Sequence, residues 1–451
     1  MKIQKQVPLT EGPILKSLTG LAVPIMISSF LGTLYNITDM AWIGLLGSKA
    51  VAAVGVGGMY VWLSQGLASL ARMGGQVHVA QCLGRGDKEQ AHRYAKTAVQ
   101  LSILLGLAFA AVSLLFTDPL VAFFKLEGAK TILDAKIYMR ITCGLILFSF
   151  LNLTLTGLYT AQGDSKTPFV ANFIGLLINL LLDPLLILGV GPFPRIEVAG
   201  AAVATVSAQF VVMFVMMVGV FRSKKEENVL KGIRLFEPFS KEELGNICKS
   251  GGPTAIQGMV YCMISMVLTR MVAAFGAEAI ATQRVGGQIE SVSWNTADGF
   301  AAALNAFVGQ NYGAKKMDRV QKGYRISFWT VAIWGALIML AFIIFPGPIA
   351  GVFFHEEKAM EIAISYLIII GFSEAFMCVE LMTIGALSGL GKTKLCSVIS
   401  ITATSMRIPL AMVLSRTSLG LDGIWWALTL TSVAKGIIFY LTFRYQMREK
   451  C

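Results

Sequence analysis

The stretch GSKAVA at residues 47–52 returns as GAEAIA at residues 276–281, and VAQCLG at residues 79–84 returns as VGQNYG at residues 308–313. The two pairs have the same spacing, because positions 47 and 79 recur at positions 276 and 308. These matching motifs recur in the same order in both parts of a very apolar chain. The sequence therefore predicts two homologous membrane halves, a construction typical of secondary transporters.

Single residues extend this internal repeat. Pro24 corresponds to Pro253, and Gly163 corresponds to Gly391 at nearly the same spacing. These residues fall where helices break or loops begin, as expected of proline and glycine. The repeat therefore covers most of the chain.

Composition places the chain in a lipid bilayer. Its mean hydropathy is +0.68, and only 14% of its residues are charged, against about 25% in a soluble domain. Apolar runs long enough to cross the hydrocarbon core recur throughout. We expect an all-α polytopic membrane protein whose twelve transmembrane helices form two pseudo-symmetric six-helix bundles. The predicted spans lie near residues 17–45, 51–80, 95–116, 132–160, 168–190, 199–221, 244–270, 280–308, 324–345, 359–389, 395–415 and 423–445.

A long polar stretch at residues 222–243 separates the halves. It predicts an N-terminal six-helix bundle at residues 1–222, a cytoplasmic linker at 223–242 and a C-terminal six-helix bundle at 243–451. Six spans in each half make both halves enter the membrane from the same side, so the repeats are expected to be parallel.

The net charge is +12, and the basic residues are distributed among the loops as expected of a membrane protein. Lys and Arg gather at residues 85–96, 222–241 and 315–325, whereas the loops at 190–198 and 346–358 are nearly bare of positive charge. The positive-inside rule then places both termini in the cytoplasm of a multi-pass plasma membrane protein, in bacteria the inner membrane. Nucleic-acid binding is not expected.

Two acids lie inside predicted spans of the first half, where a charge is costly and usually functional. Asp39 follows Tyr35 by one helical turn, and Asp183 follows Asn179 by one turn, so each pair shares a helix face. Thr205 in the sixth span can add a hydroxyl group. Two such carboxylates either share a proton or hold a cation. The alternative is a structural pair, or an acid paired with a base such as Arg72.

The second half differs at these positions. Gln257 and Tyr261 follow Pro253 by four and eight residues, with no acid between them. Glu374 is the best second candidate because no basic residue neighbours it in the sequence. Structural ion pairs remain an equal alternative for the other buried charges, Glu290, Glu380 and Lys435 among them.

Pro24 breaks a backbone hydrogen bond inside the first span. It precedes Asp39 in the same helix, so two interpretations stay open, a static kink or a hinge that bends with ion or cargo state. Pro184, Pro253 and Pro409 are expected to be static kinks.

The chain resembles the MATE (multidrug and toxic compound extrusion) transporters along its whole length. The motifs that match are LTEGPI at residues 9–14, AVP at 22–24, YNITD at 35–39 and GDSKTP at 163–168, with residues 385–394 as the counterpart of the last. Each motif is weak alone, and their order and spacing make the match specific.

The resemblance implies a V-shaped pair of six-helix bundles and efflux of compounds by cation antiport. It also implies that Asp39, Asn179, Asp183 and Thr205 belong to the N-terminal cation site of the family. Sodium-coupled NorM-like members carry a glutamate in the seventh span, where this chain has Gln257 or Tyr261. The chain therefore looks more like the DinF-like branch, and proton coupling is expected, with sodium as the alternative.

The function expected is a multidrug efflux antiporter, not an enzyme. Its expected partners are small cationic or amphipathic compounds and the lipid bilayer, and it is expected to act as a monomer without a cofactor. The rival interpretation is a flippase or exporter of a lipid-linked or specialised metabolite. An intramembrane enzyme would need nucleophile or metal motifs that the sequence does not offer, and a channel would need a pore loop.

Overall fold

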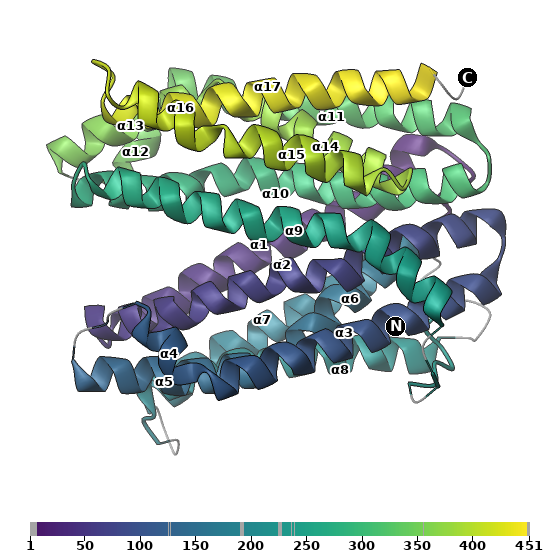
Figure 1. Cartoon of the computed structure of the whole chain (residues 1–451), viewed down its shortest axis with the longest axis horizontal. Helices are drawn as coiled ribbons and strands as arrows, with labels where there is room; N and C mark the ends of the chain where they lie inside the picture. Colours follow the sequence, from purple (N-terminus) through teal and green to yellow (C-terminus); the bar gives the residue numbers. More distant parts are fainter. Residues whose placement is uncertain are drawn as a thin grey trace. The chain divides into compact units, whose positions relative to one another are not determined.

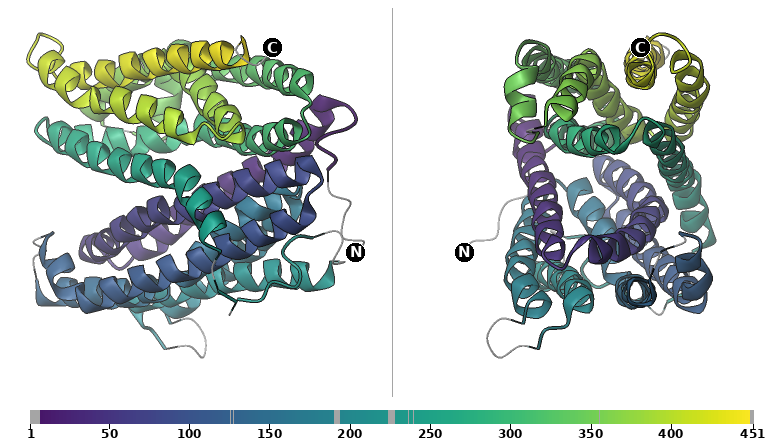
Figure 2. Two further views of the ribbon diagram at one scale, coloured as in Figure 1. Left: turned by 45° about the vertical axis from the view of Figure 1, so that its right-hand side comes forward. Right: turned by 90° about the vertical axis from the view of Figure 1, so that its left-hand side faces the viewer.

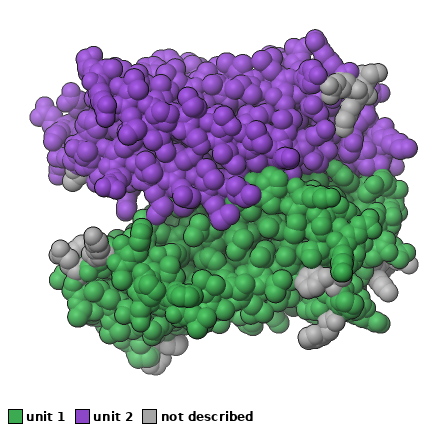
Figure 3. Space-filling model, in the orientation of Figure 1, with its two compact units in different colours: residues 1–7, 27–255 green, residues 8–26, 256–451 purple. Residues whose placement is uncertain are grey.

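The structure of the chain is a computed structural model, which describes residues 7–124, 126, 128–189, 194–223, 228–235, 237–238, 240–354 and 356–448. Every regular element within these ranges is a helix (Figure 1). The predicted all-α class is therefore confirmed. The helices divide between two compact units, which Figure 3 shows in different colours.

Unit 1 runs from Ile27 to Ala255 and includes Val7. Its core consists mainly of small and branched apolar side chains, and most of them come from α2, α3, α6 and α8. The helices that lie wholly in unit 1 are α2 (Ser48–Arg85), α3 (Lys88–Leu115), α4 (Thr117–Ala122), α5 (Ala129–Gly144), α6 (Leu147–Ala161), α7 (Lys166–Ile187) and α8 (Glu197–Arg222).

Unit 2 runs from Ile256 to the C-terminal end and includes residues 8–26. Its largest fully buried side chain is Trp425. In both views of Figure 2, the last helix, coloured yellow, runs beside the two yellow-green helices that precede it in the chain. The helices wholly in unit 2 are α10 (Ala277–Gly313), α11 (Met317–Ile344), α12 (Pro346–Gly351), α13 (Glu357–Gly371), α14 (Glu374–Gly389), α15 (Thr393–Ser405), α16 (Arg407–Leu414) and α17 (Leu421–Arg448).

Two helices belong to both units. α1 (Ile14–Gly44) changes unit after Met26, and α9 (Lys241–Ala273) changes unit after Ala255. Each change follows the proline inside the helix, Pro24 or Pro253, by two residues. The compact units thus divide the chain at other residues than the predicted bundles at 1–222 and 243–451, which stay a prediction.

Residues 8–26 are bound to unit 2 by specific contacts. Asn311 Nδ2 donates to the carbonyl oxygen of Leu9 at 2.9 Å, and Arg319 Nη1 donates to that of Gly12 at 3.0 Å. A Cβ atom at Gly299 would lie 2.4 Å from the side chain of Met26, so only glycine permits this approach. The N-terminal segment is therefore an integral part of the second unit.

The predicted spans correspond to helices or to bent pairs of helices. Among the described residues, nine helices are long and apolar enough to cross a membrane, and eleven if each bent pair counts as one span. α10 is not among them, since it carries Arg284, Glu290 and Asp298 along its length. Twelve spans therefore remain a prediction by this criterion.

Two of the predicted spans, at residues 132–160 and 359–389, are each formed by a bent pair of helices. α5 and α6 meet at 42°, and α13 and α14 meet at 51°. Each break directly follows a glycine, Gly144 or Gly371, rather than a proline, so the positions of the prolines do not indicate it. A third span is interrupted between α15 and α16, just before Pro409, which has no N–H to continue the helix.

The repeat is visible in the backbone itself. The corresponding residues Gly47 and Gly276 have φ angles of 99° and 112°, and Gly163 and Gly391 have φ angles of 83° and 79°. Residues other than glycine rarely adopt these angles. The glycines that correspond in the sequence therefore serve the same turns in both halves.

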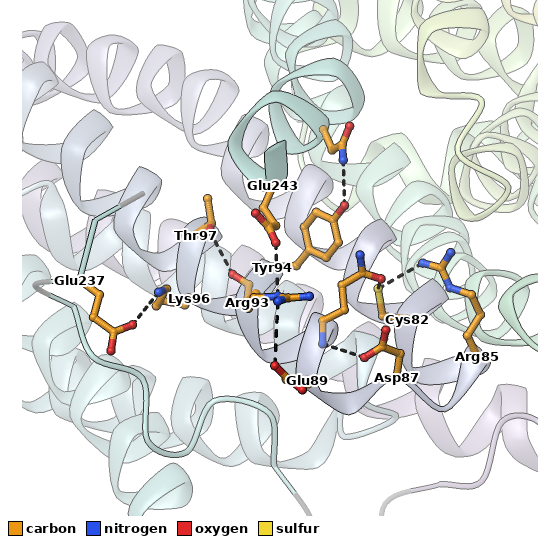
Figure 4. A network of polar contacts seen from close by, with 12 residues as sticks. Cys82, Arg85, Asp87, Glu89, Arg93, Tyr94, Lys96, Thr97, Glu237 and Glu243 are labelled. Carbon is orange, nitrogen blue, oxygen red and sulfur yellow. Dashed lines mark hydrogen bonds and ion pairs between the residues drawn. The ribbon is translucent and has the colours of Figure 1, made fainter. Parts of the chain in front are cut away.

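The described part of the linker lies against α3 of unit 1. Gln100 Nε2 donates to the carbonyl oxygens of Leu235 at 2.9 Å and Glu237 at 2.7 Å. Lys96 Nζ forms an ion pair with Glu237 at 2.7 Å, and Arg93 pairs with Glu243 at the start of α9 at 3.4 Å (Figure 4). The linker is thus fastened along one helix of the unit.

We expect Gln100→Leu to release the linker. The change removes two hydrogen bonds, each worth about 0.5–1.5 kcal/mol, so tryptic cleavage after Arg234 should become roughly 5- to 150-fold faster. The control is Lys96→Met, which removes a partly exposed ion pair worth about 0–1 kcal/mol. Mass spectrometry of a timed digest measures both rates, and equal rates for Gln100→Leu and the wild type would refute the fastening.

Candidate functional site

The structure brings the predicted residues of the first half together inside unit 1. Tyr35 Oη on α1 donates to Thr205 Oγ1 on α8 at 3.0 Å. On α7, Asn179 Nδ2 donates to Asp183 Oδ1 at 3.2 Å. Asp39 and Asp183 lie close enough to interact electrostatically, and both are buried. Three helices therefore place two carboxylates, an amide, a phenol and a hydroxyl group in one pocket.

Several acceptor atoms of this pocket have no hydrogen-bond partner in the described part of the chain. They are one carboxylate oxygen of Asp39, one of Asp183 and the amide oxygen of Asn179. A buried acceptor without a donor costs about 1–3 kcal/mol, and a charged one costs more. Neither carboxylate forms an ion pair with Arg72 within the described residues. These oxygens can accept a proton or hold a small cation.

Tyr138 of α5 is a member of this pocket that the sequence analysis missed. Its buried phenol lies close to Asp39, Asp183 and the hydroxyl group of Thr205. The ring rests on Gly57 of α2, where a Cβ atom would come within 2.4 Å of it. A tyrosine in an apolar helix resembles any core aromatic residue, so its own sequence context gives no signal.

The internal repeat does give a signal. Gly286 corresponds to Gly57 at the spacing of the repeat, and Tyr366 corresponds to Tyr138 at nearly the same spacing. A Cβ atom at Gly286 would come within 2.2 Å of the Tyr366 ring. The same glycine therefore seats the same ring in each half, beside an acid in both cases.

We expect Gly57→Ala to impair transport by displacing the Tyr138 ring. A new methyl group has no space there, so overpacking should cost about 1–3 kcal/mol of stability, and transport per inserted molecule should fall severalfold. Gly55→Ala is the control, because nothing lies within 4 Å of a Cβ atom at Gly55. Flux in vesicles and thermal unfolding compare the two. Equal flux in both variants would mean that the ring's position is unimportant.

A second group of buried acids lies in unit 2. Glu374 is fully buried at the first residue of α14, and neither of its carboxylate oxygens has a partner among the described residues. It interacts electrostatically with Glu290 of α10, which accepts a hydrogen bond from Tyr366 Oη. Glu374 thus lies near a second acid, Glu290, which the residues next to it in the sequence do not indicate.

The other candidates of the second half are placed differently. Tyr261 of α9 lies near Tyr366 and is almost half exposed. Gln257 Oε1 accepts a hydrogen bond from Ser397 Oγ of α15 at 3.1 Å. Tyr261 is therefore grouped with the two glutamates through Tyr366, whereas Gln257 links α9 to α15.

Two basic residues of unit 2 interact with its buried acids. Arg407 interacts with Glu290 and donates to Thr431 Oγ1 at 3.0 Å and Ser432 Oγ at 2.8 Å. Lys435 forms an ion pair with Glu380 at 2.8 Å. The sequence left two interpretations open for the second half, and the structure has an example of each. Lys435 and Glu380 form a structural ion pair, whereas Glu374 and Glu290 are a pair of acids without a full complement of partners among the described residues.

Helices that repeat in the sequence, cross a bilayer and enclose buried acids define a membrane transporter, not an enzyme. The comparison with family models specifies which one. The model described as MatE matches residues 24–185 and again residues 253–413, so the chain belongs to the MatE family. The two matches start at Pro24 and Pro253, the same pair that marks the repeat in the sequence, which confirms the internal repeat.

Similar proteins extend over almost the whole chain. The probable multidrug resistance protein NorM of Thermotoga maritima is 29% identical, with 98% of this chain and 95% of that protein covered. A protein of Shewanella oneidensis named FAD transporter is 26% identical, with coverage of 96% and 95%. A crystal structure described as MATE in the straight conformation shares the fold, with a TM-score of 0.90, 24% identity and 99% of both chains covered.

Proposed function

We propose that this chain is a secondary active multidrug efflux transporter that exchanges protons for cationic or amphipathic organic compounds by alternating access. The observation that carries the proposal is the pocket of Asp39 and Asp183. Two buried carboxylates with unpartnered oxygens, and no base paired to them in the described residues, are suited to gaining and losing a proton. The NorM relative is named as a multidrug resistance protein, which supports the cargo class.

The energetics are compatible with one or two protons per cargo molecule. Expelling a compound against a hundredfold gradient costs about 2.7 kcal/mol. One proton that enters down a potential of 100 mV releases about 2.3 kcal/mol. The proposal includes both termini in the cytoplasm, a plasma membrane location, a functional monomer and no cofactor beyond the coupling ion.

The test is efflux of a panel of cationic dyes from proteoliposomes. Efflux should collapse when a protonophore is added and persist when sodium is omitted. Transport that requires sodium and is unaffected by the protonophore would show sodium coupling instead. It would also contradict the likeness to the DinF-like branch that the sequence suggested.

A second candidate is export of a specialised metabolite, because one relative is named FAD transporter. The same vesicles distinguish it. A flavin nucleotide that is exported while every cationic dye is retained would favour this candidate.

We further propose that Asp39 and Pro24 couple proton and cargo. The helix α1 already lacks a backbone hydrogen bond at Pro24, so bending costs less there. Protonation of Asp39 changes its interactions with the α7 residues and favours a bent α1 with less space for cargo. Competition needs only that proton and cargo prefer different conformers. Cargo Kd should therefore depend on pH in the wild type and be weak at every pH in Asp39→Asn. Equal pH slopes would reject Asp39 as the switch.

A further inference from the structure

A groove of about 580 Å³ lies in unit 2 between α11 and α17, and no residue of either group of buried acids lines it. Its floor is formed by Tyr324, Phe443 and Met447, all of them buried. The rings of Tyr324 and Phe443 stack with centroids 3.6 Å apart, and Tyr324 Oη is hydrogen-bonded to Thr383 Oγ1 at 3.0 Å. The floor is therefore rigid and apolar.

The rim of the groove is positively charged. Arg325 of α11 and Arg444 and Arg448 of α17 line it with exposed side chains. None of its lining residues is acidic, and none of the three arginines forms an ion pair within the described ranges. The guanidinium group of Arg444 lies over the ring of Tyr440 at 5.9 Å. The rim thus offers several donors to an anion and leaves their charge uncompensated.

The remaining wall is aromatic and faces outward. Trp329 is 60% exposed and packs edge-on against Phe328, which in turn contacts Tyr440 with ring centroids 5.1 Å apart. The lining residues lie at 321–329 in the first half of α11 and at 440–448 in the last turns of α17, so the part of the groove that carries the arginines is near the ends of two membrane helices. Tryptophan, tyrosine and arginine at such ends mark the headgroup level of a bilayer.

We propose that this groove binds one anionic phospholipid. The phosphate accepts hydrogen bonds from Arg325, Arg444 and Arg448, and the first part of an acyl chain lies along Phe328 and Trp329. Basic pockets between membrane helices are suited to anionic headgroups. A soluble phosphate would use the arginines but leave the aromatic wall unoccupied, so the bilayer is the source that fits both parts of the groove.

The test is native mass spectrometry of the full chain titrated with phosphatidylglycerol or phosphatidylcholine. We expect one phosphatidylglycerol to bind more tightly than phosphatidylcholine. Each arginine contributes about fivefold to the affinity, so Arg325→Gln with Arg444→Gln should weaken binding about 25-fold. The control is Arg222→Gln with Lys322→Gln, which removes the same charge from exposed residues outside the groove.

The results separate a site from general surface charge. An equal loss in the control pair, equal binding of phosphatidylcholine, or displacement of the lipid by glycerol 3-phosphate would each overturn the proposal. A second measurement uses phosphatidylglycerol with brominated acyl chains, which should quench Trp329. Quenching that is unchanged in Trp329→Phe would place the lipid elsewhere.

Discussion

Asp183→Asn is expected to leave a folded, membrane-inserted protein whose dye efflux falls at least about tenfold, a loss of about 1.4 kcal/mol or more in coupling. The asparagine oxygen can still accept the hydrogen bond from Asn179 Nδ2, so the shape of the pocket is retained. What is lost is the ability to release a proton. Efflux rate per inserted molecule, measured beside thermal stability, tests this.

Asp118→Asn is the matched control. This exposed acid of α4 pairs with Lys136 Nζ at 2.9 Å, and the hydrogen bond and charge of Lys136 hold the pKa of Asp118 below its usual value. It is therefore ionised at every assay pH, and its replacement should leave efflux unchanged. If Asp183→Asn lost stability and kept its efflux rate, Asp183 would be a structural residue.

The second large effect is expected at the buried ion pair of unit 2. The Lys435 and Glu380 side chains are 7% and 6% exposed, and one oxygen of Glu380 has no partner among the described residues. Lys435→Met keeps the unbranched side chain up to Cε, removes the charged Nζ, and leaves an unpaired carboxylate in the interior. Such a change costs about 3–5 kcal/mol. Unfolding in detergent by heat or denaturant measures the loss.

The double variant Glu380→Leu with Lys435→Met should recover most of the stability, because no buried charge remains. Replacing a buried ion pair by apolar residues is often neutral. A single variant as stable as the wild type would show that Glu380 takes a proton at no cost, and Glu380 would then join Glu374 and Glu290 as a candidate for proton binding.

The pocket of unit 1 was largely predictable, because helical spacing alone relates Tyr35 to Asp39 and Asn179 to Asp183. Helical spacing cannot show which residues of other helices, such as Tyr138 of α5, lie beside these pairs. The proximity of Tyr138 depends on how α5 packs on Gly57 of α2, and a single glycine in a membrane span has several possible roles. Comparison of the two halves in the register of the repeat would have found it, since Gly286 and Tyr366 repeat the pair.

The second half was harder for a related reason. Its acids do not correspond in position to those of the first, so the repeat offers no guide to them. Glu374 is the first residue of α14, after the 51° bend between α13 and α14, and it interacts with Glu290 of α10, a residue that no helical spacing relates to it. The assignment of residues 8–26 to unit 2 could not be predicted either. In the sequence, the polar linker looks like the boundary between the two halves, and the prolines at which the units change do not.

The assignment of residues 8–26 to unit 2 has a consequence for biosynthesis. The hydrogen-bond donors for Leu9 and Gly12 are Asn311 and Arg319, which leave the ribosome much later, after most of the chain has been made. At roughly 5–20 residues per second, the first segment of the chain waits on the order of 15–60 s for its partners. Residues 8–26 therefore complete their hydrogen bonds to the rest of unit 2 only after most of the chain has been made, so this unit cannot form in the order of synthesis.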